Sequence, residues 1–590
     1  MTAWRWTFAH FNHDVRLTLE SKPLYNAPAA TLPARPSIRG SLGNTTRWTL
    51  LPGWRLKPLA AAIVAIGALA PGDDHAATLV VTTLAEASGT ACTLRDAVNS
   101  VNAQSDQGQC VASGAYGAGD SVGFAPSLTG TITFFNKDPL SANPGDASAL
   151  VIRRPVAIEG PGSALLSLVC GSTSYRLLEV DAGVAAASLS GLTLANCGAV
   201  GSGGGILAGF APTNVALTLQ LTDVTLAGLR AGAGGLGGGL AAFDGNVSTT
   251  VTMIACNVSG NRALRGGGLA VSSSKALTAA TVDVTDSVVV LNTATQSGGG
   301  AFVSGANAEV TFTRTTIDRN SVNLLGGGIE IELGEGTARD STVSRNTAQS
   351  GGGVGLFGSG SRFSAINSTL SGNAASSFGG GIYATRAGAN TFALANTTVA
   401  SNKAGTGGGI LVENSLSFGQ TTLANIVSIV DTIVAGNVAP TDIVSREPQA
   451  AGGVLPWDVS FSVIGQSGTV PLVGTGNITD AAVPAPFGVT GWLGPLQNNG
   501  GPTLTHALLN TFPDPALDSG DPAFSGLAYD QRGKPFKRVQ NGRVDIGAYE
   551  FRLAPTAGAA GAPVPAPRGW GLAALAALLG WLGWRLRPRR

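Results

Sequence analysis

The sequence predicts an all-β chain folded as a parallel β-helix, and three observations lead to that prediction. A short phrase returns along the chain, in forms such as STVSRNTAQSGGGVGL and TTVASNKAGTGGGILV. Within residues 203–409 the triple glycines of this phrase recur every 25 to 34 residues, which is typical of stacked repeats. Each repeat offers short runs of Val, Thr, Ile and Leu bounded by Gly, Asn and Ser, and none offers the long 3.6-residue periodicity of a helical repeat.

The recurring glycines and asparagines suit the corners between strands. The glycine triplets begin at Gly203, Gly237, Gly266, Gly298, Gly326, Gly351, Gly379 and Gly407. An asparagine lies five or six residues before six of them, at Asn261, Asn292, Asn320, Asn346, Asn373 and Asn402. Glycine adopts positive φ without steric cost, and asparagine tolerates the left-handed region. Asparagines stacked on successive turns can also form a ladder of amide hydrogen bonds, so we expect one here.

Composition agrees with this fold and excludes other classes. Glycine supplies 84 of 590 residues, and charged residues are only 12% of the chain, against about 25% in typical globular proteins. The glycines lack a three-residue period, which excludes collagen. A formal net charge of +1, with no basic stripe and interleaved aromatics, gives no indication of nucleic-acid binding.

Residues 1–77 read as a leader. A basic stretch precedes the apolar run from Leu59 to Ala70, and small residues follow it, which is the pattern of a secretory signal. Twelve residues are too few for an ordinary membrane span. The alternative is an N-terminal anchor that is not cleaved. The residues upstream of the signal are either an extended leader or the product of a misassigned start.

Residues 78–130 predict an N-terminal cap. TLVVTT forms a strand, and TLRDAVNSVNA forms a helix that Thr93 and Asp96 open with a capping-box spacing. One stripe of this helix is apolar and comprises Leu94, Ala97, Val98 and Val101. We expect the helix to cover the open N-terminal end of the β-helix core.

The five cysteines allow two disulfides. Cys92 and Cys110 bracket a short segment, and Cys170 and Cys197 lie about one coil apart, which leaves Cys256 over. Both pairings require an oxidising compartment. A metal site is less favoured, because the chain has no CxxC motif and no histidine near a cysteine.

Two stretches resemble known regions of secreted bacterial proteins. CTLRDAVNSVNA resembles the signature of the CSLREA domain, with Asp96 and Val98 as mild departures. The resemblance implies a right-handed, pectate-lyase-like parallel β-helix over residues 131–470, and it implies no activity. Residues 471–553 contain LGPLQNNGGPTLTHALLN, DQRG and DIGAYE, which resemble the choice-of-anchor Q region. We expect this segment to cap the far end of the β-helix, with its arginines and aspartates in structural pairs.

The tail predicts sorting at a membrane. A Pro/Ala linker over residues 554–567 leads to a short apolar segment with three tryptophans and an Arg-rich end over residues 568–590, typical of a stop-transfer segment. The arrangement resembles PEP-CTERM and IPTL-CTERM sorting signals, although their core wording is absent. The resemblance implies contact with the sorting machinery at the membrane and a transient inner-membrane anchor.

Aligning the coils on their glycine triplets indicates one candidate ligand strip. Its members are Phe302, Glu330, Glu332, Phe357, Tyr383 and Glu413. Aromatic faces can stack on sugar rings, and carboxylates can accept hydroxyl hydrogen bonds or hold calcium. The alternative is that these are solvated strand residues. No histidine lies in the repeats, and no pair of aspartates suggests the two carboxylates of glycoside hydrolysis.

We therefore expect an exported protein at the cell surface, in the outer membrane or outside the cell, with a non-catalytic role in adhesion or glycan contact. Its expected partner is an extracellular polysaccharide or surface glycan, with no cofactor other than possible calcium. A polysaccharide lyase or glycoside hydrolase on the same fold is one alternative. A structural component of the envelope or matrix is another.

Overall fold

The computed structural model describes residues 76–552, except for short internal stretches at 140, 142–146, 173, 182, 210–214, 246, 386–388, 417–421, 424, 447–454, 511–512 and 525. The predicted signal over residues 59–70, the linker and the tail lie outside the described residues. Within the described residues, no helix is both long and apolar enough to cross a membrane.

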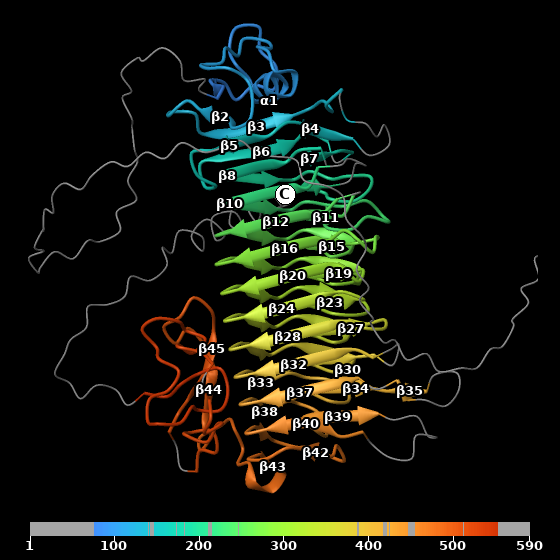
Figure 1. The fold of residues 1–590 in the computed structure, drawn as a ribbon, viewed down its shortest axis with the longest axis vertical. Coiled ribbons are helices and arrows are strands. Elements are labelled where there is room, and N and C mark those ends of the chain that lie inside the picture. The colour runs from blue at the N-terminus through green and yellow to red at the C-terminus, as the bar shows by residue number, and fades with distance from the viewer. Residues whose placement is uncertain are drawn as a thin grey trace, which may run out of the picture. The chain divides into compact units, whose positions relative to one another are not determined.

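The described chain is a right-handed parallel β-helix, as the repeats predicted (Figure 1). Three parallel sheets run along it. One turn passes through the first sheet twice, then the third sheet, then the second sheet, as residues 280–304 do in β16, β17, β18 and β19.

The first sheet has 25 strands in two ladders that β8 (Ala186–Ala195) and β10 (Leu217–Ala227) join. The first ladder also holds β1 (Thr78–Val81), β2 (Asp120–Phe124), β5 (Val156–Glu159), β12 (Thr249–Ile254), β16 (Ala280–Thr285), β20 (Ala308–Thr313), β24 (Glu335–Arg339), β28 (Arg362–Ile366), β32 (Thr391–Ala395), β37 (Ile426–Val430), β40 (Trp457–Ser460) and β42 (Leu472–Val473). The second ladder also holds β3 (Gly130–Phe134), β6 (Leu166–Cys170), β13 (Asn257–Ser259), β17 (Val288–Val290), β21 (Thr316–Asp318), β25 (Thr342–Ser344), β29 (Thr369–Ser371), β33 (Thr398–Ala400), β38 (Ile433–Ala435), β41 (Val463–Ile464) and β43 (Ile478–Thr479).

The other two parallel sheets meet at the glycine triplets. The second sheet has 11 strands: β4 (Ser148–Ile152), β7 (Arg176–Val180), β9 (Ile206–Ala208), β11 (Leu240–Phe243), β15 (Leu269–Ser272), β19 (Ala301–Ser304), β23 (Ile329–Glu332), β27 (Val354–Phe357), β31 (Ile382–Ala384), β34 (Ile410–Glu413) and β39 (Ile443–Arg446). The third sheet has five: β14 (Arg262–Arg265), β18 (Thr293–Ser297), β22 (Ser321–Val322), β26 (Thr347–Ser350) and β30 (Ala374–Phe378). Two antiparallel pairs, β35 (Ser415–Leu416) with β36 (Thr422–Leu423) and β44 (Leu493–Gln497) with β45 (Thr505–Leu508), and the short 3-10 helix η1 (Asp480–Ala482) complete the described elements.

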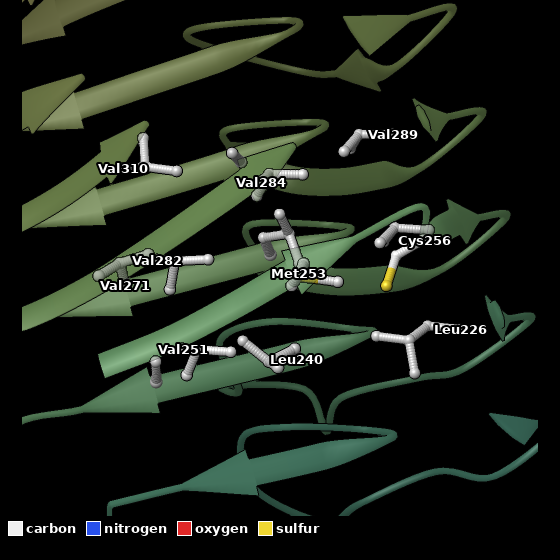
Figure 2. Packing of buried hydrophobic residues seen from close by; sticks show 14 of the residues in the cluster. Leu226, Leu240, Val251, Met253, Cys256, Val271, Val282, Val284, Val289 and Val310 are labelled. Carbon is white, nitrogen blue, oxygen red and sulfur yellow. The ribbon is translucent and has the colours of Figure 1, made fainter. Parts of the chain in front are cut away.

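The core is a column of aliphatic side chains between the sheets. Leu240 of the second sheet and Met253 and Val282 of the first sheet are fully buried, and Figure 2 shows them gathered in one interior. Alternate residues of each strand point inward, because successive side chains of a strand face opposite sides. Each fully buried Val, Leu or Met side chain stabilises the fold by roughly 1.5–3 kcal/mol.

The predicted asparagine ladder is confirmed at the corner between the first and third sheets. It runs through Asn261, Asn292, Asn320, Asn346, Asn373, Asn402 and Asn437. Each backbone N–H and each side-chain Nδ2 donates to the Oδ1 of the asparagine in the next turn, for example at 2.8 and 3.0 Å from Asn320 to Asn346. Asp442 ends the ladder by accepting both donors of Asn437.

A second ladder of hydroxyl groups follows the bend between the two halves of the first sheet. The hydroxyl of Ser341 accepts from the backbone N–H of Thr315, and the hydroxyl of Ser368 accepts from that of Ser341. The residue before each hydroxyl has positive φ, as Arg314 and Asp340 do. The small hydroxyl residue that opens the repeat phrase therefore satisfies a buried donor at several bends, with Ser287, Ser341, Ser368, Thr432 and Ser462 as the acceptors.

The N-terminal helix α1 (Leu94–Ala103) forms as predicted. The hydroxyl of Thr93 accepts from the backbone N–H of Asp96 at 3.1 Å and donates to its carboxylate at 2.9 Å. The predicted apolar stripe is buried against the first turns and belongs to the main core. The helix therefore covers the apolar end of the β-helix.

The closing segment begins at residue 471 with β42 and β43, which are the last strands of the first sheet. The rest of the segment lies along the side of the β-helix, which differs from the expected cap at its far end. Figure 1 shows β44 and β45 beside the lower part of the stack. The hydroxyl of Thr342 donates to Leu504 O at 2.6 Å, and the hydroxyl of Thr369 donates to the Gln531 side chain at 2.6 Å. The outward threonines of β25 and β29 thus supply hydrogen bonds to the segment, and these partners lie 162 residues apart in sequence.

Candidate functional site

The strand register brings the candidate strip together as the glycine alignment indicated. Phe302 pairs with Glu330 across β19 and β23, and Glu332 pairs with Phe357 across β23 and β27. Tyr383 follows one turn later, opposite Gly355. One glycine triplet precedes each of these strands, so counting from the triplets reproduces the true register.

Four of the six strip residues are buried, so the expectation of an open, solvent-facing strip is wrong for them. The exposed fractions are 1% for Phe302, 2% for Glu330, 7% for Tyr383 and 5% for Glu413. Phe357 is 39% exposed, and the Glu332 side chain is 26% exposed. Side chains of the third sheet cover three of the four buried residues: Arg265 of β14 lies over the Phe302 ring, Ser297 of β18 contacts Glu330, and Phe378 of β30 lies beside Tyr383.

Glycine is required for the corner between the second and third sheets to close. Gly326 has φ +65°, and a Cβ added there would lie 2.7 Å from the Cβ of Glu330. The same contact recurs between Gly298 and Phe302 and between Gly379 and Tyr383. The first glycine of each triplet therefore packs directly on the second residue of the following strand, which excludes water from that side chain.

Arg265 contacts the strip at Phe302 and Glu332. Its Nη1 lies 2.9 Å from Glu332 Oε2, and its Nε donates to Gln296 Oε1 at 3.2 Å. Its guanidinium also lies 5.2 Å from the centroid of the Phe302 ring. Such a cation–π contact contributes roughly 0.5–1 kcal/mol at an exposed site. The Glu332 carboxylate is therefore already engaged by a cation.

Arg446 occupies the strip at its other end. Its Nη1 lies 3.2 Å from Glu413 Oε1, and the Tyr383 hydroxyl donates to Glu413 Oε2 at 2.8 Å. The guanidinium lies 4.3 Å from the centroid of the Phe378 ring, and that ring lies 5.9 Å from the ring of Tyr383. These four side chains form a polar and aromatic cluster.

Glu330 lies between these two clusters in an unusual state. Burial raises the pKa of Glu330 to about 8, and the nearby Glu332 carboxylate adds to the rise, while a hydrogen bond with Ser297 and the charge of Arg265 oppose it. Its Oε2 is buried without a hydrogen bond. The side chain is therefore a neutral carboxylic acid at pH 7, unlike the ionised strip residue that its sequence position suggested.

The strip offers ion pairs and one exposed aromatic edge. Both ionised carboxylates, those of Glu332 and Glu413, are held by arginines, and Glu330 lies beneath the surface. Across the described ranges, no three His, Cys, Asp or Glu side chains gather as metal ligands. The exposed Phe357 ring, beside Glu332 in the register, is the part of the strip that can contact a ligand from solution.

A groove that sequence reasoning missed lies over parts of four turns, from Asn196 to Thr295. It has a volume of about 690 Å³ and is lined by Gly198, Ala199, Arg230, Gly232, Arg262 and Leu264, among others. The two arginines are exposed and occupy neighbouring turns, joined by a backbone bridge. The sequence did contain a signal for this groove. Arg230 and Arg262 each directly follow the residue at the asparagine-ladder position, which is Leu229 in one turn and Asn261 in the next.

Both candidate disulfides are present. Cys92 bonds to Cys110, and Cys170 bonds to Cys197, which lines the groove. Cys256 is a buried free thiol. The first bridge joins the start of α1 to the loop that follows it, and the second joins two successive turns.

No family model and no curated protein matches the chain.

Proposed function

We propose that this chain is an exported, cell-surface-associated β-helix protein with a non-catalytic role in adhesion or glycan contact. Its N-terminal cap would be a CSLREA-type region and its closing segment a choice-of-anchor Q-type region. The signal over residues 59–70 and the sorting tail over residues 568–590 would direct export and retention at the surface, where the tail meets the sorting machinery. The partner would be an extracellular polysaccharide or a surface glycan.

One observation carries the non-catalytic part of the proposal, namely that arginines hold the ionised carboxylates of the strip. Glycoside hydrolysis uses two carboxyl groups about 5–9.5 Å apart across the sugar, one to give a proton and one to attack or activate water. Glu332 and Glu413 are engaged by Arg265 and Arg446, and Glu330 is 2% exposed. This arrangement favours a surface that holds its shape over one that transfers protons.

Two further features support export and contact. The chain carries two disulfides, which persist in oxidising compartments. Phe357 exposes its ring on a rigid strand, and aromatic faces are common in sugar-binding surfaces because they offer a large apolar area at low entropic cost.

A glycan array probed with the purified full-length protein tests the proposal, together with an assay for newly formed reducing ends and unsaturated products. We expect binding to at least one extracellular polysaccharide and no cleavage. Phe357→Ala should weaken binding through the strip about tenfold. Phe135 is also exposed but lies outside the strip, so Phe135→Ala is the matched control and should leave binding unchanged.

Two outcomes would replace the proposal. Cleavage of a polysaccharide that Glu330→Gln abolishes would establish a lyase or hydrolase on this fold. Failure to bind any glycan, with the protein located in the envelope by fractionation, would favour a structural envelope or matrix component.

A further inference from the structure

The groove, whose lining runs from Asn196 to Thr295, exists because one turn is longer than the next. Leu229 precedes Gly237 by eight positions, whereas Asn261 precedes Gly266 by five. The extra residues form a ledge in which Gly232 N donates to Gly201 O at 2.8 Å and Leu264 N donates to Gly235 O at 3.0 Å. A Cβ on Gly232 would lie 1.5 Å from Val200 O, so only glycine allows the ledge to pack against the preceding turn.

Two arginines stand on consecutive turns of this groove. Arg230 and Arg262 are both exposed, and their backbones form a parallel bridge, so their Cα atoms are about 4.8 Å apart. In the part of the chain that the structure describes, neither guanidinium has a hydrogen bond or an ion pair. Like charges placed opposite each other on neighbouring strands repel, and an anion between them removes that cost.

The rest of the groove leaves room for a ligand. Gly198, Ala199, Ala231 and Ala233 line it with side chains no larger than a methyl group, and its lining in the described residues contains no carboxylate. The volume of about 690 Å³ lies within the range of about 300–1,000 Å³ typical of small-molecule sites. The groove is therefore a positively charged recess on the surface of the β-helix.

We infer that this groove binds the acidic groups of a polysaccharide, with Arg230 and Arg262 each holding a carboxylate or sulfate of the chain. A guanidinium presents parallel N–H donors that match the oxygens of such groups. The inference rests on the proposed glycan contact, and it concerns a site separate from the strip around Phe357.

A polysaccharide fits the groove better than a nucleic acid. Single-stranded nucleic acids are held by basic grooves whose aromatic side chains stack on the bases. The described lining of this groove includes no aromatic residue, and the whole chain has a formal net charge of +1. Two arginines with small neighbours favour a ligand that presents single charges on a flexible, hydroxylated chain.

Titration calorimetry of the full-length protein at low ionic strength tests the inference, with oligogalacturonate, dextran sulfate, neutral dextran and single-stranded DNA as probes. The variants Arg230→Thr and Arg262→Thr place in each position the residue that the same column carries in the turn after Arg262, Thr293. We expect each to weaken binding of the acidic glycan about tenfold and the double variant to abolish it. Arg362→Thr, on the outer face of β28, removes an exposed arginine outside the groove and should leave binding unchanged.

The probes separate the possible results. Binding of oligogalacturonate alone assigns a carboxylated ligand, and binding of dextran sulfate alone assigns a sulfated one, and both support the inference. Equal affinity in the wild type and the double variant overturns it, as does DNA binding that matches the glycans. Binding of neutral glycans that the double variant retains would leave the proposed function standing and remove this inference, whereas no binding of any glycan would remove both.

Discussion

At the scale of single residues, the asparagine ladder couples each turn to the next. Asn346 accepts from the backbone and side-chain nitrogens of Asn320 and donates from Nδ2 to Ile317 O at 3.0 Å and to Asn373 at 2.9 Å. All three asparagines are fully buried. One side chain therefore satisfies polar groups on both neighbouring turns at once.

We expect Asn346→Ala to lower the free energy of unfolding by about 3 kcal/mol or more, because it leaves several buried groups without partners at about 1–3 kcal/mol each. Urea unfolding measures the change. Asn307 is half-buried, and its side chain donates only to the carbonyls of Lys275 and Ala276 in solvent-exposed hydrogen bonds, so Asn307→Ala should cost less than about 1 kcal/mol. Equal losses in the two variants would show that the ladder contributes nothing special.

The buried side chain of Glu330 makes the free energy of unfolding depend on pH. Its pKa is raised from 4.5 to about 8 in the folded state, chiefly by burial. The folded protein therefore holds this proton in a range where the unfolded chain has released it. The stabilising effect of the proton is complete below about pH 4.5 and is lost as the pH rises through about 8.

Glu330→Gln should remove this dependence, since glutamine is neutral at every pH. We expect the variant and the wild type to be similarly stable at pH 4.5, and the variant to be more stable by on the order of 3 kcal/mol at pH 9. Chemical unfolding at several pH values gives the comparison, and Glu159→Gln, at an exposed position of β5, is the matched control. Parallel pH profiles for Glu330→Gln and the wild type would contradict the argument.

At the scale of elements, sequence patterns predicted the features that depend on local interactions. The capping residues and apolar stripe of α1, the short strands and the corner asparagines all depend on neighbours in sequence or on the next repeat. The closing segment lacks that regularity. Its contacts pair Thr342 and Thr369 with residues 162 positions away, and no periodic signal indicates which face such a segment covers.

Gln531 fixes the closing segment to the β-helix. Its Oε1 accepts from Thr369, and its Nε2 donates to Ser341 O at 3.1 Å and to Leu504 O at 3.1 Å. The side chain is fully buried, so it holds the segment and two turns together.

Gln531→Ala should loosen the segment without unfolding the repeats. We expect cleavage by a protease within residues 484–552 to become at least about tenfold faster, because the change leaves buried partners unsatisfied at about 1–3 kcal/mol each. Limited proteolysis with mass spectrometry locates the cuts. Gln540 is exposed and its side chain donates only to Lys537 O, so Gln540→Ala should be cleaved like the wild type; if both variants behave alike, Gln531 does not hold the segment.

At the scale of the whole molecule, the repeat predicted which residues pair across neighbouring strands but not which of them are exposed to solvent. Counting from the glycine triplets placed Phe302, Glu330 and Tyr383 on one column, as the strand pairs show. Their burial depends on how two sheets meet at a corner, which no single repeat encodes. The groove at Arg230 and Arg262 depends on a difference in length between neighbouring turns, so it becomes visible only when the turns are stacked.

The cysteines give a test of the proposed export. Its five cysteines form the bonds Cys92–Cys110 and Cys170–Cys197 and leave Cys256 free. Burial raises the pKa of the Cys256 thiol to about 11, and a buried, protonated thiol does not react as a nucleophile. The bridges close short loops, and a loop of about 15–30 residues contributes roughly 3–4 kcal/mol in the chain-entropy model.

We expect the exported, folded protein to take up no alkylating reagent, the unfolded but unreduced protein to take up one equivalent, and the reduced and unfolded protein to take up five. Intact mass spectrometry counts the labels, and peptide mapping should place the single label on Cys256. The variant Cys256→Ser should remain unlabelled until it is reduced, which controls for bonds broken during unfolding. A label on Cys92 or Cys170 before reduction would show that the exported chain does not form these bonds, and it would remove the support that the cysteines give to an oxidising compartment.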